Sequence, residues 1–213
     1  TATQIAQSFI SQNVDMICAI ATPSAQTAYN AVLTANADIP VVFTAVSAPV
    51  EAGLANDDGT PVGNVTGTSD LLPIAKQLEL IRALLPDATK VGLLYSSSET
   101  NSEVQAGLYE AIAADYGFEI VVGTVTSGAE VSQAVDALLP QVDCLSMLTD
   151  NTVVSYLAVV LAAAQTAGKP VFGSEIEQVS LGCVAAEGLD YVALGKQTGE
   201  MAALTVSPDV QGQ

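Results

Sequence analysis

The sequence predicts an α/β protein of two similar doubly wound parallel-sheet lobes, joined by a hinge, with the first lobe incomplete. Three observations lead to this fold class. Short apolar runs alternate with segments of helical periodicity, which is typical of parallel sheets covered on both faces. Half of the 213 residues are apolar, enough for a substantial core. An internal repeat, finally, relates the two halves of the chain.

The expected elements follow one another in regular order. Each expected strand is a run of mostly apolar residues without helical spacing, and we place these strands at residues 14–21, 40–45, 90–95, 119–125, 142–148, 170–172 and 182–185. Each expected helix is an amphipathic or apolar segment, and we place these helices at residues 25–35, 72–85, 102–116, 130–138, 153–167 and 191–204. A helix after each strand brings the strands of one sheet into parallel order.

The repeat is visible when two stretches are aligned. NVDMICAIATPSAQTA matches QVDCLSMLTDNTVVSY, and ADIPVVFTA matches AGKPVFGSE. Three matched pairs keep nearly one spacing, of 128, 130 and 129 residues: Asp15 with Asp143, Pro40 with Pro170, and Gly53 with Gly182. A constant spacing over a helix–strand–loop–helix–strand unit predicts two lobes built alike.

The repeat also suggests domain boundaries. We expect a first lobe at residues 1–68 and 181–206, a second lobe at 69–180, and a tail at 207–213. The Gly- and Thr-rich segment 63–68 has the composition of a hinge, and two crossings between lobes suit closure around a ligand. The β-α-β stretch at 90–125 has no counterpart in the first repeat. We therefore expect roughly 40 residues of the first lobe, with any leader, to lie outside this sequence.

Composition argues for a binding protein. Five Lys and Arg residues against 23 Asp and Glu give a net charge of −18, which excludes binding to nucleic acid or to an anionic membrane. The chain has no His and a single Arg, Arg82. It lacks a P-loop, a nucleophile elbow, a dinucleotide fingerprint and the HExxH motif. We expect no catalytic residue, no metal and no cofactor, and we interpret Cys18, Cys144 and Cys183 as buried free thiols.

Candidate ligand residues lie in the loops that follow the strands. Ligands of open parallel sheets bind beyond the carboxyl ends of the strands, where these loops meet. In the first lobe the loop residues are Thr22, Pro23, Ser24, Ala25, Gln26 and Ser47. In the second lobe they are Glu99, Asn101, Ser102, Asp150, Asn151, Ser174 and Glu175. We expect both sets to face one cleft.

The chemistry of these loops suits a zwitterion. Residues 22–24 resemble a helix start, which is either an ordinary cap or a site for a carboxylate on free N–H groups. Glu99, Asp150 and Glu175 either cap their helices or bind an ammonium group. Capping and ligand contact are both open for the Asn and Ser side chains. Tyr95, Tyr156 and Phe43 are interpreted as core residues.

The sequence resembles a known family in several motifs. They are GNVTGTSDLLPIAKQLELIRALLPDATKVGLLYSSSETNS, AIATPSAQ, FGSEIEQVSLG and EGLDYVALGKQTGEMA, which together span nearly all of the chain. They resemble the ABC-transporter substrate-binding proteins of the tryptophan/tyrosine-uptake type. The resemblance implies the periplasmic-binding-protein fold of class I, an aromatic amino acid as ligand, a membrane permease as partner, and no nucleic acid.

The resemblance also assigns residues and a location. Thr22 to Gln26 match the family's first-lobe binding loop, and Glu99, Asn101 and Ser102 match its E-x-N-S loop in the second lobe. Residues 150 and 151 match the loop after the next strand, and residues 174 and 175 match its G-S-E turn. The protein would be a monomer outside the cytoplasm, periplasmic or lipid-anchored.

Two other functions remain open from sequence. A ligand-sensing domain of a receptor or regulator shares this architecture. A hydrolase or isomerase would have to use Glu99 and Asp150, for which no acid–base partner of matched character is present.

Overall fold

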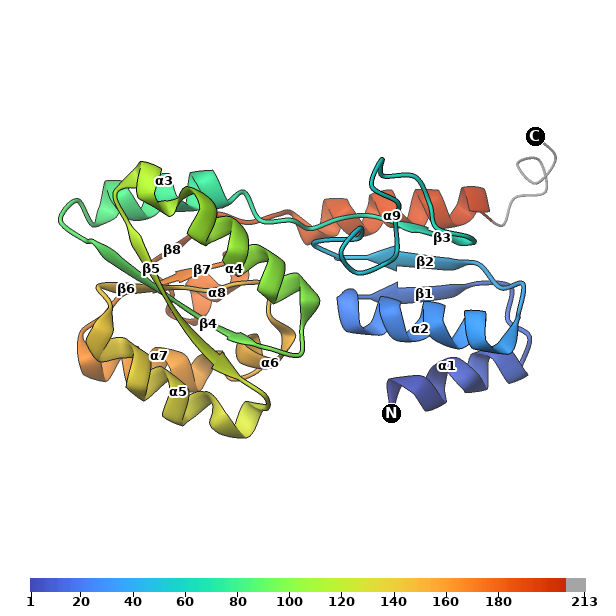
Figure 1. Cartoon of the computed structure of the whole chain (residues 1–213), viewed down its shortest axis with the longest axis horizontal. Helices are drawn as coiled ribbons and strands as arrows, with labels where there is room; N and C mark the ends of the chain where they lie inside the picture. Colours follow the sequence, from blue (N-terminus) through green and yellow to red (C-terminus); the bar gives the residue numbers. More distant parts are fainter. Residues whose placement is uncertain (206–213) are drawn as a thin grey trace. The chain divides into compact units, whose positions relative to one another are not determined.

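The protein is described by a computed structural model that covers residues 1–205, and the tail expected at 207–213 lies outside the described residues. The chain forms two compact units, each with its own sheet (Figure 1). Unit 1 contains residues 1–71 and the segment from Asp190 onward, and unit 2 contains Leu72–Leu189. The chain therefore passes from one unit to the other twice. The α/β class with parallel strands is confirmed.

Unit 2 is built on a five-stranded sheet whose strands all run parallel. Their order is β5-β4-β6-β7-β8. The bounds are β4 Lys90–Ser96, β5 Glu119–Val125, β6 Cys144–Ser146, β7 Val171–Gly173 and β8 Ala185–Ala186. The helices are α3 Ile74–Leu84, α4 Thr100–Ile112, α5 Val131–Leu138, α6 Asn151–Val154, α7 Leu157–Ala167 and α8 Ile176–Leu181, with 3₁₀ turns at Ala113–Tyr116, Gly128–Glu130 and Leu139–Gln141.

Helices cover both faces of this sheet. Figure 1 shows α3 and α4 on one face and α5 and α7 on the other. Alternate residues of β6 and its flanks serve the two cores: Leu145 and Met147 pack with α5 and α7, and Cys144 and Leu148 pack with α3 and α4. Burial on both faces explains why these strands are continuous apolar runs.

Unit 1 is a smaller version of the same plan. Its three parallel strands are ordered β1-β2-β3, with bounds Ile17–Ile20, Val41–Thr44 and Val65–Gly67. The helices are α1 Ala2–Ser11, α2 Thr22–Ala35 and α9 Tyr191–Thr205. Helix α2 packs on β1 and β2, with α1 against it, while α9 packs on β2. The core of the unit includes Val32, Val41, Phe43 and Leu54.

The hydrogen bonds of the two sheets reproduce the sequence repeat. The N–H of Ile17 donates to the carbonyl of Pro40 at 2.9 Å, and the N–H of Leu145 donates to the carbonyl of Pro170 at 3.0 Å. Strands β1 and β2 thus correspond to β6 and β7. The two strand pairs differ in what lies beside them. Strand β6 also pairs with β4, whereas β1 is the edge strand of its sheet within the described residues. Cys18 on β1 is accordingly exposed, so its interpretation as a buried thiol was wrong, while Cys144 and Cys183 are buried.

Several elements differ from the expected ones. Residues 65–67 form β3, although their Gly and Thr content indicated a hinge; Gly67 lies so close to Phe43 of β2 that a Cβ there would clash with backbone. The helix expected at 153–167 is divided into α6 and α7, and α8 was not foreseen. Segments of four to six residues carry too little periodicity to be recognised.

The second crossing lies further along the chain than the sequence indicated. We expected residues from 181 onward to join the first lobe, but the division falls between Leu189 and Asp190. The reason is β8, which pairs with β7 through Phe172–Ala185 and Gly173–Ala186 and so belongs to unit 2. The first crossing likewise falls after Leu71 instead of Thr68.

Asp143 anchors the beginning of β4 to the beginning of β6. Its Oδ2 accepts the N–H groups of Thr89 and Lys90 at 2.7 and 2.9 Å and the Thr89 hydroxyl at 3.2 Å. The backbone hydrogen bonds, that of Thr89 first and that of Lys90 second, lower the pKa of Asp143. The charged form is therefore favoured in the folded protein.

We expect Asp143→Asn to destabilise the protein by about 1–2 kcal/mol at neutral pH, because the charged acceptor is lost. The lowered folded-state pKa means that the stabilisation is complete above the unfolded pKa of about 4 and is lost as pH falls through the folded value. Denaturant unfolding from about pH 7 to about pH 3 checks this, with Asp136→Asn, an exposed acid on α5, as control. A difference from wild type that stays constant over that range would contradict it.

Candidate functional site

The strand order of unit 2 reverses between β4 and β6. The chain goes from β4 to β5 on one side and then to β6 on the other side of β4. In open parallel sheets the carboxyl ends of the strands beside such a reversal form the usual ligand crevice. The loop between β4 and α4 and the loop between β6 and α6 meet at this edge, as their hydrogen bonds show. Five candidate residues of the second lobe lie in these two loops or at their helix starts.

Glu99 holds the first turn of α6. It is 4% exposed, and its Oε2 accepts the N–H and side-chain amide of Asn151 at 2.9 and 2.7 Å. Its Oε1 accepts the N–H and hydroxyl of Thr152, both at 2.8 Å. First-turn N–H groups lack partners within the helix, and Glu99 supplies them from another loop. Both oxygens are therefore engaged inside unit 2.

Asp150 performs a similar role from the other loop. It is fully buried, and its Oδ1 accepts the N–H of Val153 at 2.6 Å, so it is the N-cap of α6. Its Oδ2 accepts the N–H of Ser96 at 2.8 Å and the hydroxyl of Ser102 at 2.7 Å. Burial raises the pKa of Asp150, while the hydrogen bonds from these three residues oppose the rise. Of the two alternatives left open by sequence, the geometry is that of a cap.

Asn101 leaves one buried acceptor unused. Its side-chain amide donates to the carbonyl of Thr149 at 2.8 Å and to the hydroxyl of Ser102 at 3.3 Å. Its Oδ1 is buried, and within residues 1–205 no hydrogen-bond partner reaches it. A buried polar atom without a partner is uncommon in folded proteins and calls for an explanation, such as a bound group.

Ser174 and Glu175 follow β7 at the same edge. Ser174 is buried, with its hydroxyl donating to the carbonyl of Leu148 at 3.2 Å. Glu175 is half-buried, and its Oε1 accepts the side-chain amide of Gln178 at 3.2 Å. In the described part of the chain its Oε2 has no partner. Among the three acids proposed for an ammonium, Glu175 alone combines partial exposure with an unused carboxylate oxygen.

In unit 1 the start of α2 has unused donors. The residue before it, Ala21, has φ 70° and ψ 156°, a conformation that costs a residue other than glycine about 1–3 kcal/mol. Ala21 supplies no side-chain cap, and the N–H groups of Thr22 and Ser24 have no partner among residues 1–205. The Thr22 hydroxyl is buried and likewise without a partner in the described chain. This arrangement suits an anion.

The remaining candidate residues of unit 1 are exposed, buried in its core or hydrogen-bonded within the unit. Pro23 is exposed, Ala25 is buried in the core, and the Gln26 amide donates to the carbonyl of Ala52 at 3.1 Å. Ser47 is buried, and its hydroxyl donates to Asp70 at 2.7 Å. Sequence reasoning missed Asp70, which is 3% exposed. An Asp two residues after the Gly- and Thr-rich segment 63–68 was the available signal.

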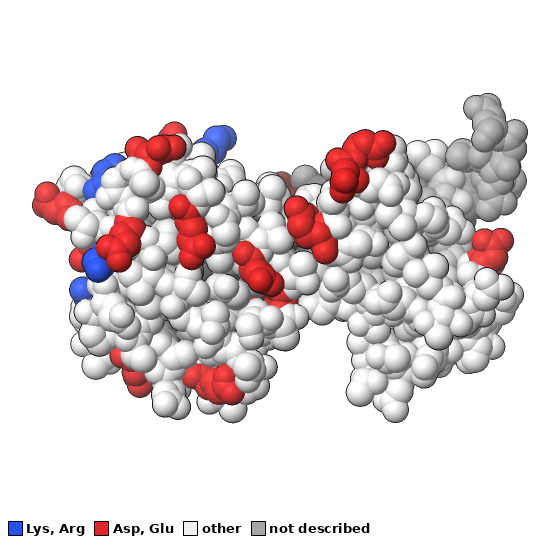
Figure 2. Space-filling view, in the orientation of Figure 1, with Lys and Arg blue, Asp and Glu red and all other residues white. Residues whose placement is uncertain are grey.

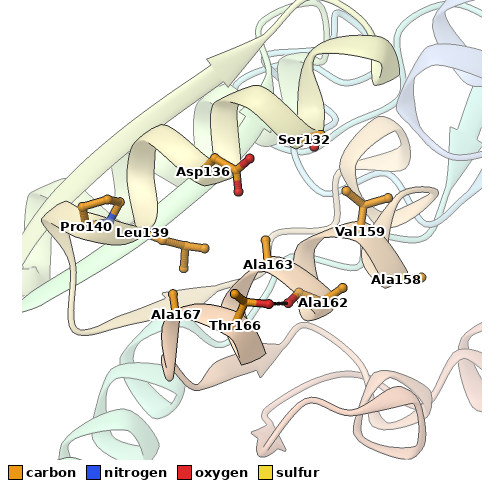
Figure 3. Close-up of a pocket in the computed structure, with 10 residues that line it drawn as sticks. All are labelled: Ser132, Asp136, Leu139, Pro140, Ala158, Val159, Ala162, Ala163, Thr166 and Ala167. Carbon is orange, nitrogen blue, oxygen red and sulfur yellow. Dashed lines mark hydrogen bonds between the residues drawn. The ribbon is translucent and has the colours of Figure 1, made fainter.

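Other surfaces carry less chemistry. A hollow of about 620 Å³ between α5 and α7 is lined mainly by small and apolar side chains, with Asp136 as its charged residue (Figure 3). On the face in Figure 2, Lys and Arg gather on unit 2 while acids occur on both units. In residues 1–205, three or more metal-ligating side chains do not cluster, and no helix is long and apolar enough to cross a membrane.

We expect Asp150→Ala to lower the free energy of unfolding by about 2–4 kcal/mol, because Ser96, Ser102 and Val153 lose a buried charged acceptor. Denaturant unfolding measures the loss, and Glu103→Ala, an exposed acid on α4, is the matched control. Wild-type stability of the Asp150 variant would show that this network does not hold the edge together.

Comparison with known proteins places the chain in a family. Residues 1–206 match the family described as ABC transporter substrate binding protein. The chain is 43% identical over 202 residues to a tyrosine-binding protein of Clostridioides difficile strain R20291, covering 95% of this chain and 57% of that protein. The chain thus spans little more than half the length of this curated relative.

Solved structures that resemble this chain support the same family. The ABC domain in complex with L-Trp from Streptococcus pneumoniae has a TM-score of 0.91 and 33% identity, covering 100% of this chain and 71% of that chain. A ligand-free, open structure of a substrate-binding protein with adhesive properties from Clostridium difficile has a TM-score of 0.65 and 39% identity, covering 100% of this chain and 69% of that chain. The resemblance seen in the sequence is confirmed: the chain belongs to the family of ABC transporter substrate-binding proteins.

Proposed function

We propose that this chain is part of a protein that captures an aromatic amino acid, tyrosine or tryptophan, between its two units by hinge closure, and delivers it to a membrane permease. The family membership supports a binding role, and two relatives support the ligand class. One of them is described as tyrosine-binding, and the other was solved in complex with L-Trp. A third relative is described as ligand-free and open, which supports a change of domain arrangement on binding.

The observation that carries the proposal is the position of two orphan atoms. The Thr22 hydroxyl and the Asn101 Oδ1 are the buried side-chain atoms without partners among residues 1–205. Both lie in loops that the sequence predicted as ligand loops, one in each unit. Buried polar groups normally have hydrogen-bond partners. A polar ligand that reaches these loops would supply the partner that each of the two atoms lacks.

We assign the ligand carboxylate to the start of α2. The N–H groups of Thr22 and Ser24 and the Thr22 hydroxyl can donate to it, and the positive end of the helix dipole favours an anion. Arg82, the single Arg of the chain, lies on α3, where its guanidinium binds the carbonyls of Tyr116 and Pro86. The anion-binding groups that we assign in unit 1 are therefore the backbone donors and the Thr22 hydroxyl at this helix start.

We assign the ammonium group to Glu175. Its Oε2 is unused within the described chain, whereas Glu99 and Asp150 direct all their oxygens to donors inside unit 2. We therefore give Glu99, Ser102 and Asp150 the role of holding the edge in shape, with Asn101 and Asn151 available to the ligand. Asn151 is exposed, and its side-chain Oδ1 is the atom that we expect to meet the ligand.

In this proposal the protein releases its ligand unchanged and acts as a monomer outside the cytoplasm, as binding components of ABC importers do. The family match supports transport over the alternative of a sensing domain in a receptor or regulator. The absence of His and of nucleophile motifs supports binding over hydrolysis or isomerisation.

The first test is a ligand panel. We expect tyrosine, tryptophan or phenylalanine to raise the stability of the full-length protein by about 2.7 kcal/mol at a hundredfold excess over the dissociation constant. Lysine and glutamate should leave it unchanged, since their side chains carry charge. Thermal unfolding screens the panel and titration calorimetry gives the affinity. No response to any aromatic amino acid would rule out this ligand class.

The second test separates the ammonium from the rest of the ligand. Glu175→Gln should weaken binding of the aromatic amino acid about tenfold, because a charge-assisted hydrogen bond is lost. The same substitution should have little effect on the binding of an analogue of that amino acid in which the amino group is absent. Glu177→Gln, an exposed acid two residues further on, is the matched control. Equal losses for the amino acid and the analogue would exclude the ammonium role of Glu175.

A further inference from the structure

The two crossings between the units are joined to each other inside unit 1 by one buried carboxylate. Asp70 lies one residue before the end of the first passage through unit 1, and Tyr191 begins α9 after the second crossing. The Tyr191 hydroxyl donates to Oδ2 of Asp70 at 2.9 Å. Oδ1 of the same carboxylate accepts the hydroxyl of Ser47 at 2.7 Å. Asp70 thus binds both crossings and the loop after β2.

A buried amide makes the corresponding connection inside unit 2. Gln77 of α3 is 2% exposed, and its Oε1 accepts the N–H of Glu187 at 2.9 Å. Its Nε2 donates to the carbonyl of Gly173 at 3.0 Å, directly before Ser174. The first crossing leads into α3, which contains Gln77, and the second crossing begins after Glu187. Gln77 therefore connects both crossings with the ligand loop at Ser174.

The second crossing lies directly on that ligand loop. A Cβ at Gly188 would be 2.6 Å from the carbonyl oxygen of Ser174 and 2.9 Å from the Cα of Glu175. No side chain fits between them without displacing backbone. The position of residue 188 therefore depends on the position of the turn at residues 174 and 175.

Two short stretches remain outside these connections. Between Asp70 and the start of α3 lie residues 71–73, and between Gly188, which lies against the turn at 174 and 175, and Tyr191 lie residues 189–190. Each is two or three residues long and crosses from one unit to the other. Hinges are a few residues of this kind, next to elements that move as rigid bodies.

We propose that Asp70 and Gln77 are positioning residues that confine hinge bending to residues 71–73 and 189–190. Each residue fixes both crossings to its own unit, Asp70 through Tyr191 and Gln77 through Glu187. Each also ties the hinge to one ligand loop, at Ser47 and before Ser174. This inference rests on the proposed function, because it assigns the hinge by which that function operates.

The experiment measures the distance between the units in the full-length protein. Spin labels on Asn30→Cys in α2 and Gln133→Cys in α5, in a Cys18→Ser background, report the distribution of distances by pulsed electron resonance. Tyr191→Phe removes the hydroxyl that reaches Asp70, and Gln77→Met removes all three hydrogen bonds of the amide, including the one to the Ser146 hydroxyl. Tyr116→Phe and Gln165→Met are the matched controls. Circular dichroism verifies that each variant is folded.

We expect Tyr191→Phe and Gln77→Met to broaden the ligand-free distance distribution about twofold, while the two controls keep the wild-type width. Affinity for the aromatic amino acid should fall about three- to tenfold, because fewer molecules are in the arrangement that can close. Wild-type widths in both variants would overturn the proposal. If Gln77→Met does not fold, Tyr191→Phe alone decides.

The ligand-free distances need no ligand, so they test the hinge independently of the proposed function. A wild-type protein that binds no aromatic amino acid but shows broadening in the variants would refute the function and keep the hinge. Normal binding by the wild type with unchanged widths in the variants would refute the hinge and keep the function.

Discussion

The edge of unit 2 depends on two aspartates that flank one short strand. Asp143 precedes β6 and accepts N–H groups at the start of β4, while Asp150 follows β6 and accepts the N–H of Ser96 at the end of β4. The neighbouring strand is thereby fixed at both ends by charged acceptors, although only two residue pairs join β4 to β6 in the sheet. The loops after β4 and β6 keep their relative positions because these carboxylates hold them. The bonds of Glu99 to Asn151 and Thr152 join the same two loops.

Patterns of period and spacing predicted much of the fold. Long apolar strands such as β4 and β5 were placed to within a residue, because seven consecutive residues carry a clear signal. The repeat predicted that β1 and β2 correspond to β6 and β7, and the bonds of Ile17 and Leu145 agree. Short elements were placed less well: β3 and α8 were missed, and the strand expected at 182–185 meets β8 only at Ala185. β3 and β8 form because partner strands supply their hydrogen bonds, and two or three residues carry no such signal in the sequence.

The candidate site shows where local reasoning ends. The loops were identified by rule, since parallel strands bring their carboxyl ends to one edge. The sequence could not predict which of these side chains point into the protein, because Glu99, Asp150 and Glu175 look equivalent in sequence. Glu99 and Asp150 find backbone donors more than fifty residues away along the chain or across one helix turn, whereas Glu175 finds Gln178 alone. Asp70 escaped notice for the same reason, as its partners Ser47 and Tyr191 are distant in sequence.

The bonds of Asp70 also fix the direction of two protons. A carboxylate can only accept, so the hydroxyls of Ser47 and Tyr191 each give it their single proton. The start of α2, in the same unit, offers the N–H groups of Thr22 and Ser24, which can only donate, beside the Thr22 hydroxyl, which can also accept. A ligand that turned its ammonium group toward the N–H groups at this helix start would therefore set donor against donor.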